Sequence, residues 1–552
     1  MLDLEVALKS FERNKSRDPL GFANETFLEG VAGINFKTAI LRLLNKIKTE
    51  QVFPRALEKC NISSIWKKKG SRHQFDDYRG IFRVTILRSI LDRLIYNDEF
   101  QNIDKNLTDA NVGARKGRNI RDNIFVLSAI TNSVQSKKQS AVDVQVLDVE
   151  KCFDSLWLHE CINDLYDAGF VSDKLPLIFM ENQNAQVAIK TGDKLSNRVS
   201  MKNIVMQGSV WGSTMCTTLM DKLGKLAYQN EDMLYRYRGK VAVPPLLMVD
   251  NILSIQKCTN TIRVNAAINS FIETKKLNLG LKKCSRIHIG KTKTSCHQLY
   301  VHESLMNESS REKYLGDIID KSGNIKATIQ DRKNRAYAII SEIKAILTEI
   351  PLGKHRVEIG LQLRQAMFIN GILFNSEAWH GVTKNDIEAL EKLDQILLRF
   401  LLGSHAKTPV EMLYLESGTM PLSFIISTRR VIYLQTLLKR NDNEVTKQVL
   451  LSQIEDPYKG DFIQLVEDDL KAISFPVNYE LVKKSPAIEF KNLIKKKFKT
   501  AAFEHLVKLK QNHSKVRQIN HSELKTQEYL LSHVFSNKDA EMIFSLWTKI
   551  NK

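Results

Sequence analysis

The sequence predicts a mixed α/β domain followed by a largely helical region. Between residues 140 and 320, segments of alternating hydrophobicity are interspersed with segments of helical periodicity, the pattern typical of an α/β domain. From about residue 325 onward, apolar residues recur almost wholly at helical spacing. With 552 residues, 43% of them hydrophobic, the chain can form several domains and a large core.

The chain is strongly basic, with 82 lysines and arginines against 62 acidic residues and a net charge of +20. This charge favours a polyanionic partner. Nucleic acid fits better than a membrane, because no apolar run approaches the roughly 18 residues that span a bilayer. The N-terminus lacks the apolar core of a signal peptide. We therefore expect an intracellular protein, nuclear or cytoplasmic, without a membrane partner.

Seven cysteines are scattered without a C-x-x-C pair, which indicates reduced thiols rather than a disulfide framework. A zinc site must be considered where five cysteines and histidines fall close together: Cys284, His288, Cys296, His297 and His302. No two of these cysteines have zinc-knuckle spacing, and Ile287 and Ile289 alternate with polar residues as in a strand. The sequence favours a strand here over a zinc site.

The N-terminal 130 residues mix short helices with basic loops. Apolar residues at helical spacing predict packed helices over 36–48 and 81–100, with a polar, basic segment at 67–78 between them.

From about residue 140 the hydrophobic period changes to two, and the strand that begins at Val142 ends at Asp148. The apolar runs 246–249 and 252–255 flank Asp250 and Asn251, which predicts a hairpin with these two residues as its turn. The other elements expected in this region are helices over 157–167, 213–228 and 264–276 and strands over 286–289 and 313–319.

The C-terminal half is predicted to be helical. We expect helices over 336–350, ended by Pro351, over 354–374, and from a cap at Thr383 to Gly403. Residues 483–517 hold eleven lysines and arginines against two glutamates, with Lys495, Lys496 and Lys497 as the densest run. This segment is either a phosphate-tracking surface or the solvated face of an amphipathic helix.

Two carboxylates stand at strand ends about a hundred residues apart, Asp148 and Asp250. Taken singly, each is more often a turn or cap residue. If their strands are neighbours, the pair forms a metal site, because acidic oxygens are hard ligands that suit Mg²⁺ in two-metal phosphoryl transfer.

Seven sequence blocks, in their order along the chain, resemble a reverse transcriptase of the non-LTR (LINE-type) retrotransposons. LDVEKCFDSLW (147–157), VMQGSVWG (205–212) and MVDN (248–251) resemble the palm motifs of that family. KKGSRHQFDDYRGI (68–81) and NVGARKGRNIRDNI (111–124) resemble its fingers blocks, KYLGDII (313–319) its primer-grip strand, and LESGTMP (415–421) a turn after the thumb. The resemblance spans roughly residues 15–440.

The resemblance implies a right-hand polymerase fold. An N-terminal extension and fingers would occupy 1–135, and a palm with the metal site 136–322, so that the reverse transcriptase domain covers roughly 50–322. A helical thumb (323–440) and a basic helical C-terminal extension (441–552) would follow. The implied activity is RNA-directed DNA synthesis with two Mg²⁺ ions, or Mn²⁺ in their place. The implied partners are an RNA template, a DNA primer or RNA–DNA duplex, and deoxynucleoside triphosphates.

The resemblance also assigns roles to single residues. Asp148 and Asp250 would ligate the metals, and Lys283 would act as a general acid near the triphosphate, unless it is only an exposed lysine. Phe153 would exclude ribonucleotides, which does not prevent it from being a core aromatic. The other implied contacts, each with a plain turn or basic loop as the alternative, are Lys68 and Arg79 on the triphosphate, Gln207 and Gly208 against the nascent base pair, and Arg115, Lys116 and Arg118 on the template backbone.

Two positions depart from the family pattern. Met206 stands where the family usually has proline, and Asn251 replaces the second aspartate of the metal box. An amide oxygen can ligate Mg²⁺ but brings no charge, so we expect weakened metal binding more than complete loss of activity.

The alternatives to an active polymerase are an inactive relic that binds RNA or RNA–DNA duplex and, less favoured, a maturase-like splicing cofactor. No nuclease module is expected at either end, which indicates a truncated or decayed element copy without its own target cutting.

Overall fold

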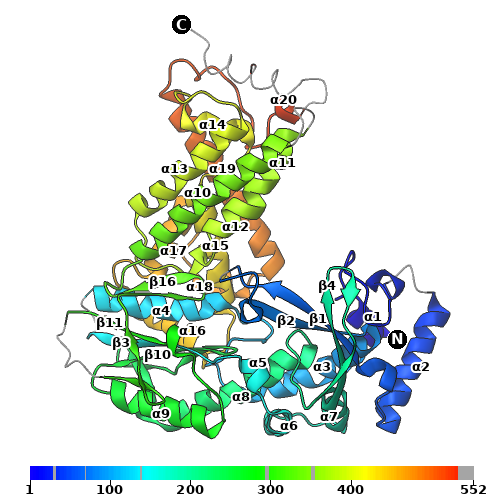
Figure 1. Cartoon of the computed structure of the whole chain (residues 1–552). Helices are drawn as coiled ribbons and strands as arrows, with labels where there is room; N and C mark the ends of the chain where they lie inside the picture. Colours follow the sequence, from blue (N-terminus) through cyan, green and yellow to red (C-terminus); the bar gives the residue numbers. More distant parts are fainter. Residues whose placement is uncertain are drawn as a thin grey trace.

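The computed structural model describes residues 1–28, 33–68, 70–136, 140–291, 298–349, 355–531 and 542. Two β-sheets and their covering helices form the lower part of the molecule, and a lobe built almost entirely of helices stands above one of these sheets (Figure 1). The predicted order, a mixed α/β region followed by a helical region, is confirmed. No helix within these described ranges is long and apolar enough to cross a membrane.

The first sheet lies beside the N-terminal helices, with strand order β2-β1-β4-β5 and β6 paired to β4. The elements of this part are α1 (Leu2–Leu8), α2 (Ile34–Glu50), β1 (Lys59–Trp66), β2 (Tyr78–Val84), α3 (Ile86–Asn106), β4 (Asn184–Thr191), β5 (Lys194–Leu195) and β6 (Val199–Lys202).

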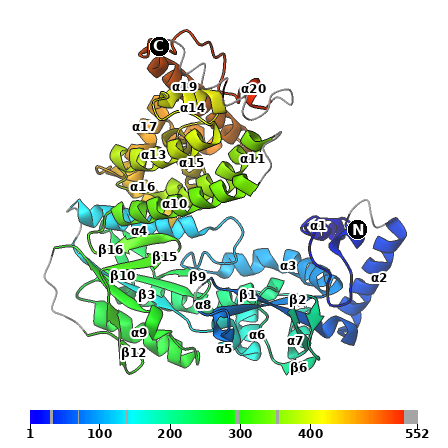
Figure 2. The same ribbon diagram turned by 45° about the horizontal axis from the view of Figure 1, so that its top comes forward.

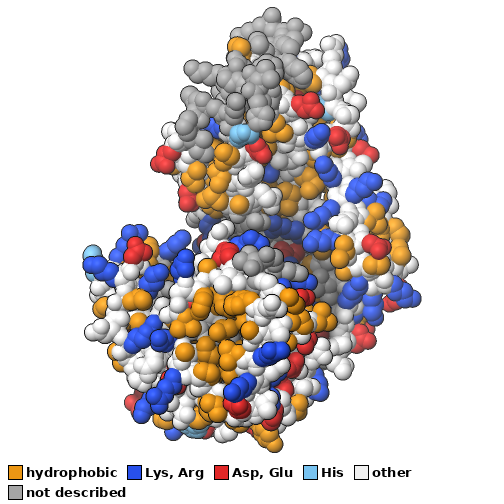
Figure 3. Space-filling model, turned by 90° about the vertical axis from the view of Figure 1, so that its right-hand side faces the viewer, with side chains coloured by type: hydrophobic (Ala, Val, Ile, Leu, Met, Phe, Trp, Pro, Cys, Tyr) orange, Lys and Arg blue, Asp and Glu red, His pale blue; other side chains and the backbone are white. Residues whose placement is uncertain are grey.

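The predicted helix over 81–100 is wrong at its start. Residues 81–84 belong to β2, which pairs with β1 along its whole length, and α3 begins only after the cap at Thr85. The helix predicted over 36–48 is present as α2, but only one side of it is packed. Phe36 and Leu43 are each 41% exposed, and hydrophobic side chains gather on the face seen in Figure 3.

The second sheet has the order β14-β11-β3-β10-β9, with α4 on one face and α9 on the other (Figures 1 and 2). The predicted strands around Asp148 and Asp250 and at 286–289 and the three predicted helices are present, as β3 (Val142–Asp148), β9 (Leu246–Met248), β10 (Asn251–Lys257), β11 (Ser285–Ile289), α6 (Leu158–Asp167), α8 (Val210–Gln229) and α9 (Thr261–Thr274). Four further elements of this part were not predicted from the sequence, and these are β14 (Asn307–Glu308), α4 (Ile120–Gln135), α5 (Cys152–Ser155) and α7 (Leu175–Gln183).

Strand β3 alternates apolar and polar side chains, yet both of its faces are buried. Val142 and Val144 join the core beside α4, which is the usual reason for a period of two. On the other face Gln145 accepts a hydrogen bond from Asn265 of α9 at 3.1 Å. The Gln145 side chain is therefore paired with α9 rather than hydrated.

Two turns differ from the sequence prediction. The hairpin turn is Val249–Asp250 rather than Asp250–Asn251, because Asn251 already pairs with Met248 as the first residue of β10. The single strand predicted over 313–319 is instead two strands, β15 (Arg311–Tyr314) and β16 (Asp317–Asp320). Leu315 and Gly316 separate them with φ values of +44° and +100°.

The small hairpins and the helical lobe complete the fold. The hairpins are β7 (Tyr235–Tyr237) with β8 (Val241–Val243) and β12 (Tyr300–Val301) with β13 (Ser304–Leu305). The lobe comprises α10 (Lys326–Glu349), α11 (Arg356–Leu363), the π-helical segment Arg364–Ile369, α12 (Asn370–Ile372), α13 (Lys384–Leu401), α14 (Val410–Ser417), α15 (Leu422–Leu438), α16 (Val445–Glu455), α17 (Phe462–Ala472), α18 (Tyr479–Lys484), α19 (Ala487–Gln511) and α20 (Glu528–Leu531).

Several predicted features of the lobe can be checked directly. Thr383 caps α13 in a capping box with Asp386, as predicted. The predicted helix over 354–374 is interrupted by the π-helical segment. The predicted stop at Pro351 lies outside the described residues.

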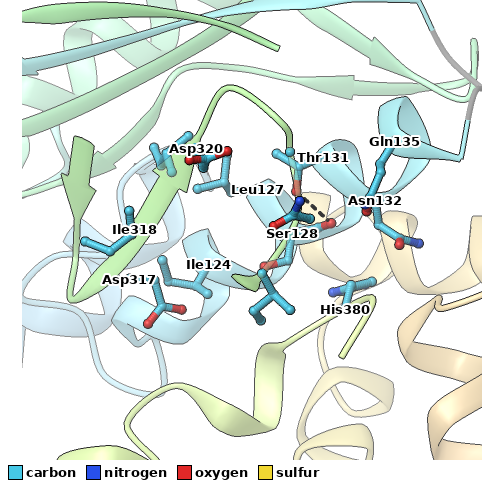
Figure 4. Close-up of a pocket in the computed structure, with 14 residues that line it drawn as sticks. Ile124, Leu127, Ser128, Thr131, Asn132, Gln135, Asp317, Ile318, Asp320 and His380 are labelled. Carbon is cyan, nitrogen blue, oxygen red and sulfur yellow. Dashed lines mark hydrogen bonds between the residues drawn. The ribbon is translucent and has the colours of Figure 1, made fainter. Parts of the chain in front are cut away.

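A small cavity lies where α4, β16 and His380 meet (Figure 4). Burial lowers the pKa of His380 to about 3, so this imidazole is neutral, and its Nδ1 lies 3.1 Å from the carbonyl oxygen of Ala378. Asp317, at the other side of the cavity, accepts hydrogen bonds from Arg332 and, at 3.0 Å, from Trp379. The cavity lies at the interface between the sheet and the helical lobe. None of the predicted site residues lines it.

Candidate active site

The two predicted carboxylates are brought together by strand pairing. β3 and β10 are antiparallel neighbours, and Asn251 lies directly opposite Asp148 in their register. Asp250 precedes Asn251 in the turn, and its carbonyl oxygen accepts a hydrogen bond from Val149 N–H at 3.4 Å. Asp148 lies at the end of β3, and Asp250 lies in the turn just before β10. The two residues therefore stand at the same end of these neighbouring strands.

The electrostatics of this edge favour a bound cation. The pKa of Asp250 is raised, chiefly by burial and further by the charge of Asp148, while Lys283 and Arg79 partly offset the shift. Lys283 Nζ lies 2.5 Å from Asp148 Oδ2. The carboxylates of Asp148 and Asp250 repel each other, and a cation between them would relieve that repulsion. Such a pair of carboxylate oxygens fits Mg²⁺.

Asn251 is bound to its neighbour within the site. Its side-chain Nδ2 donates to Asp250 Oδ1 at 3.1 Å. An aspartate at this position would instead add a negative charge beside Asp250. Asn251 thus engages one carboxylate oxygen of Asp250 and adds no charge to the site.

Gly113, which we did not identify from the sequence, packs closely against the turn that holds Asp250. A Cβ at Gly113 would lie 2.6 Å from the backbone nitrogen of Val249 and 2.7 Å from its Cγ2. The segment around Gly113 also adds to the edge of β9, because Val112 N–H donates to Leu247 O at 3.1 Å and Leu247 N–H donates to Ala110 O at 2.8 Å. Gly113 lies within the predicted fingers block 111–124. Its contact residue, Val249, is far away in the sequence, so local sequence patterns could not predict the contact.

Gln207 and Gly208 lie against β2. Phe82 N–H donates to Gln207 O at 2.8 Å, and Gly208 has φ +105°. A Cβ at Gly208 would lie 2.9 Å from both Ile81 Cγ2 and the carbonyl oxygen of Phe82. The absence of a side chain at Gly208 therefore allows the segment before α8 to meet the first sheet.

We expect Gly208→Ala to destabilise this junction by about 1–3 kcal/mol, because the alanine must both adopt a left-handed backbone and displace Phe82 O. Urea unfolding of the full chain measures the change. Gly192→Ala is the matched control, since it has φ +59° but no neighbour within 4 Å, so that only the backbone strain remains. Equal effects of the two variants would contradict the contact with β2.

The predicted nucleotide-contacting residues occupy different settings. Lys68 is exposed after β1, and Arg79, also exposed, is close enough to Asp250 to lower that carboxyl's pKa. Phe153, on α5, is partly buried and packs against the main core cluster. Its role as a core aromatic is therefore real, and the exclusion of ribonucleotides stays a prediction.

Of the three basic residues assigned to the template, only Lys116 is exposed. Arg115 is buried and donates to Asp104 Oδ1 at 2.6 Å and to Asn111 O at 3.0 Å. Arg118 donates to Glu444 Oε2 at 2.6 Å. These two arginines hold the fold together, so we keep the template-contact prediction for Lys116 alone.

The basic run of α19 faces away from the core. Phe490, Ile494 and Phe498 are buried, whereas Lys495 and Lys496 are exposed and Lys497 is half-buried. Helix α19 stands in the lobe above the sheets, apart from β3 and β10 (Figure 1). Its position is compatible with either prediction, a phosphate-tracking surface or a solvated face.

The fold is that of a right-hand polymerase, with fingers and palm followed by a helical thumb and a basic helical extension. Residues 66–319 match the family model described as "Reverse transcriptase (RNA-dependent DNA polymerase)". This part of the chain is therefore similar to a reverse transcriptase domain, and the match includes Asp148, Asp250 and Lys283.

A curated relative is the RNA-directed DNA polymerase from mobile element jockey of Drosophila funebris, 20% identical over 376 residues. These residues are 66% of this chain, which spans only 40% of the relative's length. Among solved structures, apo telomerase from Candida tropicalis aligns over 83% of this chain and 74% of its own, at 12% identity and a TM-score of 0.39. Telomerase from Candida albicans with a fragment of telomeric RNA aligns over 76% and 65%, at 12% identity and a TM-score of 0.37.

Proposed function

We propose that the protein is an RNA-directed DNA polymerase of the non-LTR retrotransposon type, which extends a primer with deoxynucleotides by two-metal transfer. The observation that carries the proposal is the register of β3 and β10, which sets Asn251 opposite Asp148 and Asp250 beside both. The reverse transcriptase family match supports it. The domain limits of 1–135, 136–322, 323–440 and 441–552 belong to the same proposal.

The residues of the site divide the work as follows. Asp148 and Asp250 would hold two Mg²⁺ ions, which supply charge neutralisation at the phosphate and lower the pKa of the attacking hydroxyl. Arg79 and Lys68 would bind the triphosphate. Phe153 would lie under the sugar and exclude a 2′-hydroxyl.

Lys283 would have two positions in this scheme. Without a bound cation its ammonium neutralises Asp148, at 2.5 Å. Once the carboxylate is engaged by metal, the ammonium would be free to reach the triphosphate and protonate the leaving pyrophosphate.

A specific observation favours the alternative of a duplex-binding relic. The hydrogen bond from Asn251 Nδ2 to Asp250 Oδ1 holds a metal-ligand oxygen with a neutral donor. If that bond outcompetes the metal, the fold would still present its basic surfaces to RNA without catalysing synthesis.

Primer extension on an RNA template across a Mg²⁺ titration tests the proposal. We expect the native chain to extend the primer, Asp148→Ala to abolish extension, and Asn251→Asp to lower the Mg²⁺ requirement by about tenfold, because the added carboxylate strengthens metal binding.

Asn197→Asp is the matched control, since it adds the same charge at an exposed position outside the site. A native chain no more active than Asp148→Ala, beside an active Asn251→Asp, would overturn the polymerase proposal for this sequence. Salt-dependent RNA binding retained in all variants would then identify the relic.

A further inference from the structure

The opposite end of the palm sheet carries a second cluster of possible metal ligands. Asp143 of β3, His288 of β11 and Cys258, just after β10, offer one ligand atom each, and these atoms all lie within 4.8 Å of one another. Asp143 and His288 lie directly opposite each other in the β3–β11 register, and Cys258 follows β10, the strand on the other side of β3. His288 was considered from the sequence as a possible zinc ligand, but neither Asp143 nor Cys258 was.

We propose that this cluster binds zinc through these three protein ligands. His288 Nδ1 lies 3.0 Å from Asp143 Oδ1 and 3.7 Å from Cys258 Sγ. Zinc at about 2.0–2.3 Å from nitrogen, oxygen and sulfur in tetrahedral geometry separates its ligand atoms by about 3.3–3.6 Å. The three side chains therefore already surround a position of the right size, with the mixed thiolate, imidazole and carboxylate donors that suit this metal.

The surroundings of Asp143 resemble a supported metal ligand. Its carboxylate is fully buried and accepts hydrogen bonds from Arg286, at 2.9 and 3.0 Å, and from Thr261 Oγ1 at 2.5 Å. A ligating carboxylate is commonly held in this way by groups behind it. Zinc would replace the hydrogen bond between Asp143 and His288, while Thr261 and Arg286 keep the second oxygen in place.

A metal ion can reach the site from solvent. An open hollow lined by His288, Gly290, Glu308 and Lys321 lies beside it and offers space for a water molecule as the fourth ligand. Cys258 would lose its thiol proton to solvent on binding, and with it the contact from Sγ to Ala141 O at 3.5 Å.

Metal binding at this site would stabilise the same strands that carry Asp148 and Asp250 at their other end. Asp143 and Asp148 are five residues apart on β3, or about 17 Å of extended strand. A bound ion would fasten β10 and β11 to β3, and the register of β3 with β10 is what places Asn251 opposite Asp148. The zinc site thus has a structural role that does not depend on polymerase activity.

Metal binding by the full-length chain tests this inference. After removal of metal with a chelator, we expect one equivalent of Co²⁺, as a spectroscopic substitute for zinc, to give a thiolate-to-cobalt charge-transfer band. Cys258→Ser and His288→Ala should weaken binding by about 100-fold or more. Cys60→Ser, a buried thiol in the other sheet, should leave binding unchanged.

A second measurement needs no variant. We expect one equivalent of Zn²⁺, but not Mg²⁺, to protect Cys258 from alkylation in the native chain, as read by mass spectrometry, and to raise the melting temperature. A band that persists in Cys258→Ser, or a native chain that neither binds Co²⁺ nor protects Cys258 with Zn²⁺, would overturn the zinc site and leave a buried Asp143–Arg286–His288 network.

Discussion

Gly113→Ala is expected to reduce primer extension on the order of 100-fold. The new methyl group would lie 2.6 Å from Val249 N, so the turn that presents Asp250 must move. Displacement of a catalytic group by about 1 Å can cost this much, because the reacting atoms lose their alignment. Single-nucleotide extension, measured in the native and the Asn251→Asp backgrounds, gives the change.

Gly280→Ala provides a matched control at the same site. Gly280 N–H donates to Asp148 O at 2.9 Å, yet a Cβ there would meet only Asp148 O and Glu150 Cβ, both at 3.8 Å. This substitution should leave extension within a few-fold of the native rate, since that distance is ordinary van der Waals contact. Similar losses in both variants would show that any alanine near the site is harmful, and that Gly113 has no special part in placing Asp250.

The strands that carry the site could be predicted because their signals are local. The alternation from Val142 to Asp148 and the two apolar runs around Asp250 each span only a few residues, and both formed as expected. The hairpin turn was misplaced by one residue, since Val249 with φ +57° takes a left-handed conformation that sequence preferences would assign to Asn251.

The supporting contacts could not be predicted, because they join segments far apart in the sequence. Arg115 in a basic loop has the pattern of a phosphate-binding residue, and only the fold shows that Asp104 and Asn111 O satisfy it. Gly113 is in the same position, since its need for close approach arises from Val249. The sequence thus indicated the carboxylates, while the residues that hold them required the three-dimensional structure.

The helical lobe contains a buried ion pair between Arg364 and Asp394. Arg364, in the π-helical segment, forms two parallel hydrogen bonds with Asp394 of α13, at 2.7 and 2.6 Å, and both residues are buried. Arg364→Leu would leave Asp394 as a buried carboxylate without its counter-ion, so we expect a loss of about 3–5 kcal/mol in the free energy of unfolding. Urea unfolding followed by helical circular dichroism measures the loss.

The double variant Arg364→Leu/Asp394→Leu separates the charge from the packing. Because it removes both charges, it should be more stable than Arg364→Leu alone, as expected where the damage comes from an unpaired buried ion. The control Lys384→Ala breaks an exposed pair with Glu388 on α13 and should change stability by no more than about 0.5 kcal/mol. A double variant less stable than the single one would mean that the pair contributes through its shape in the core, and that charge compensation is not what holds α13 against the π-helical turn.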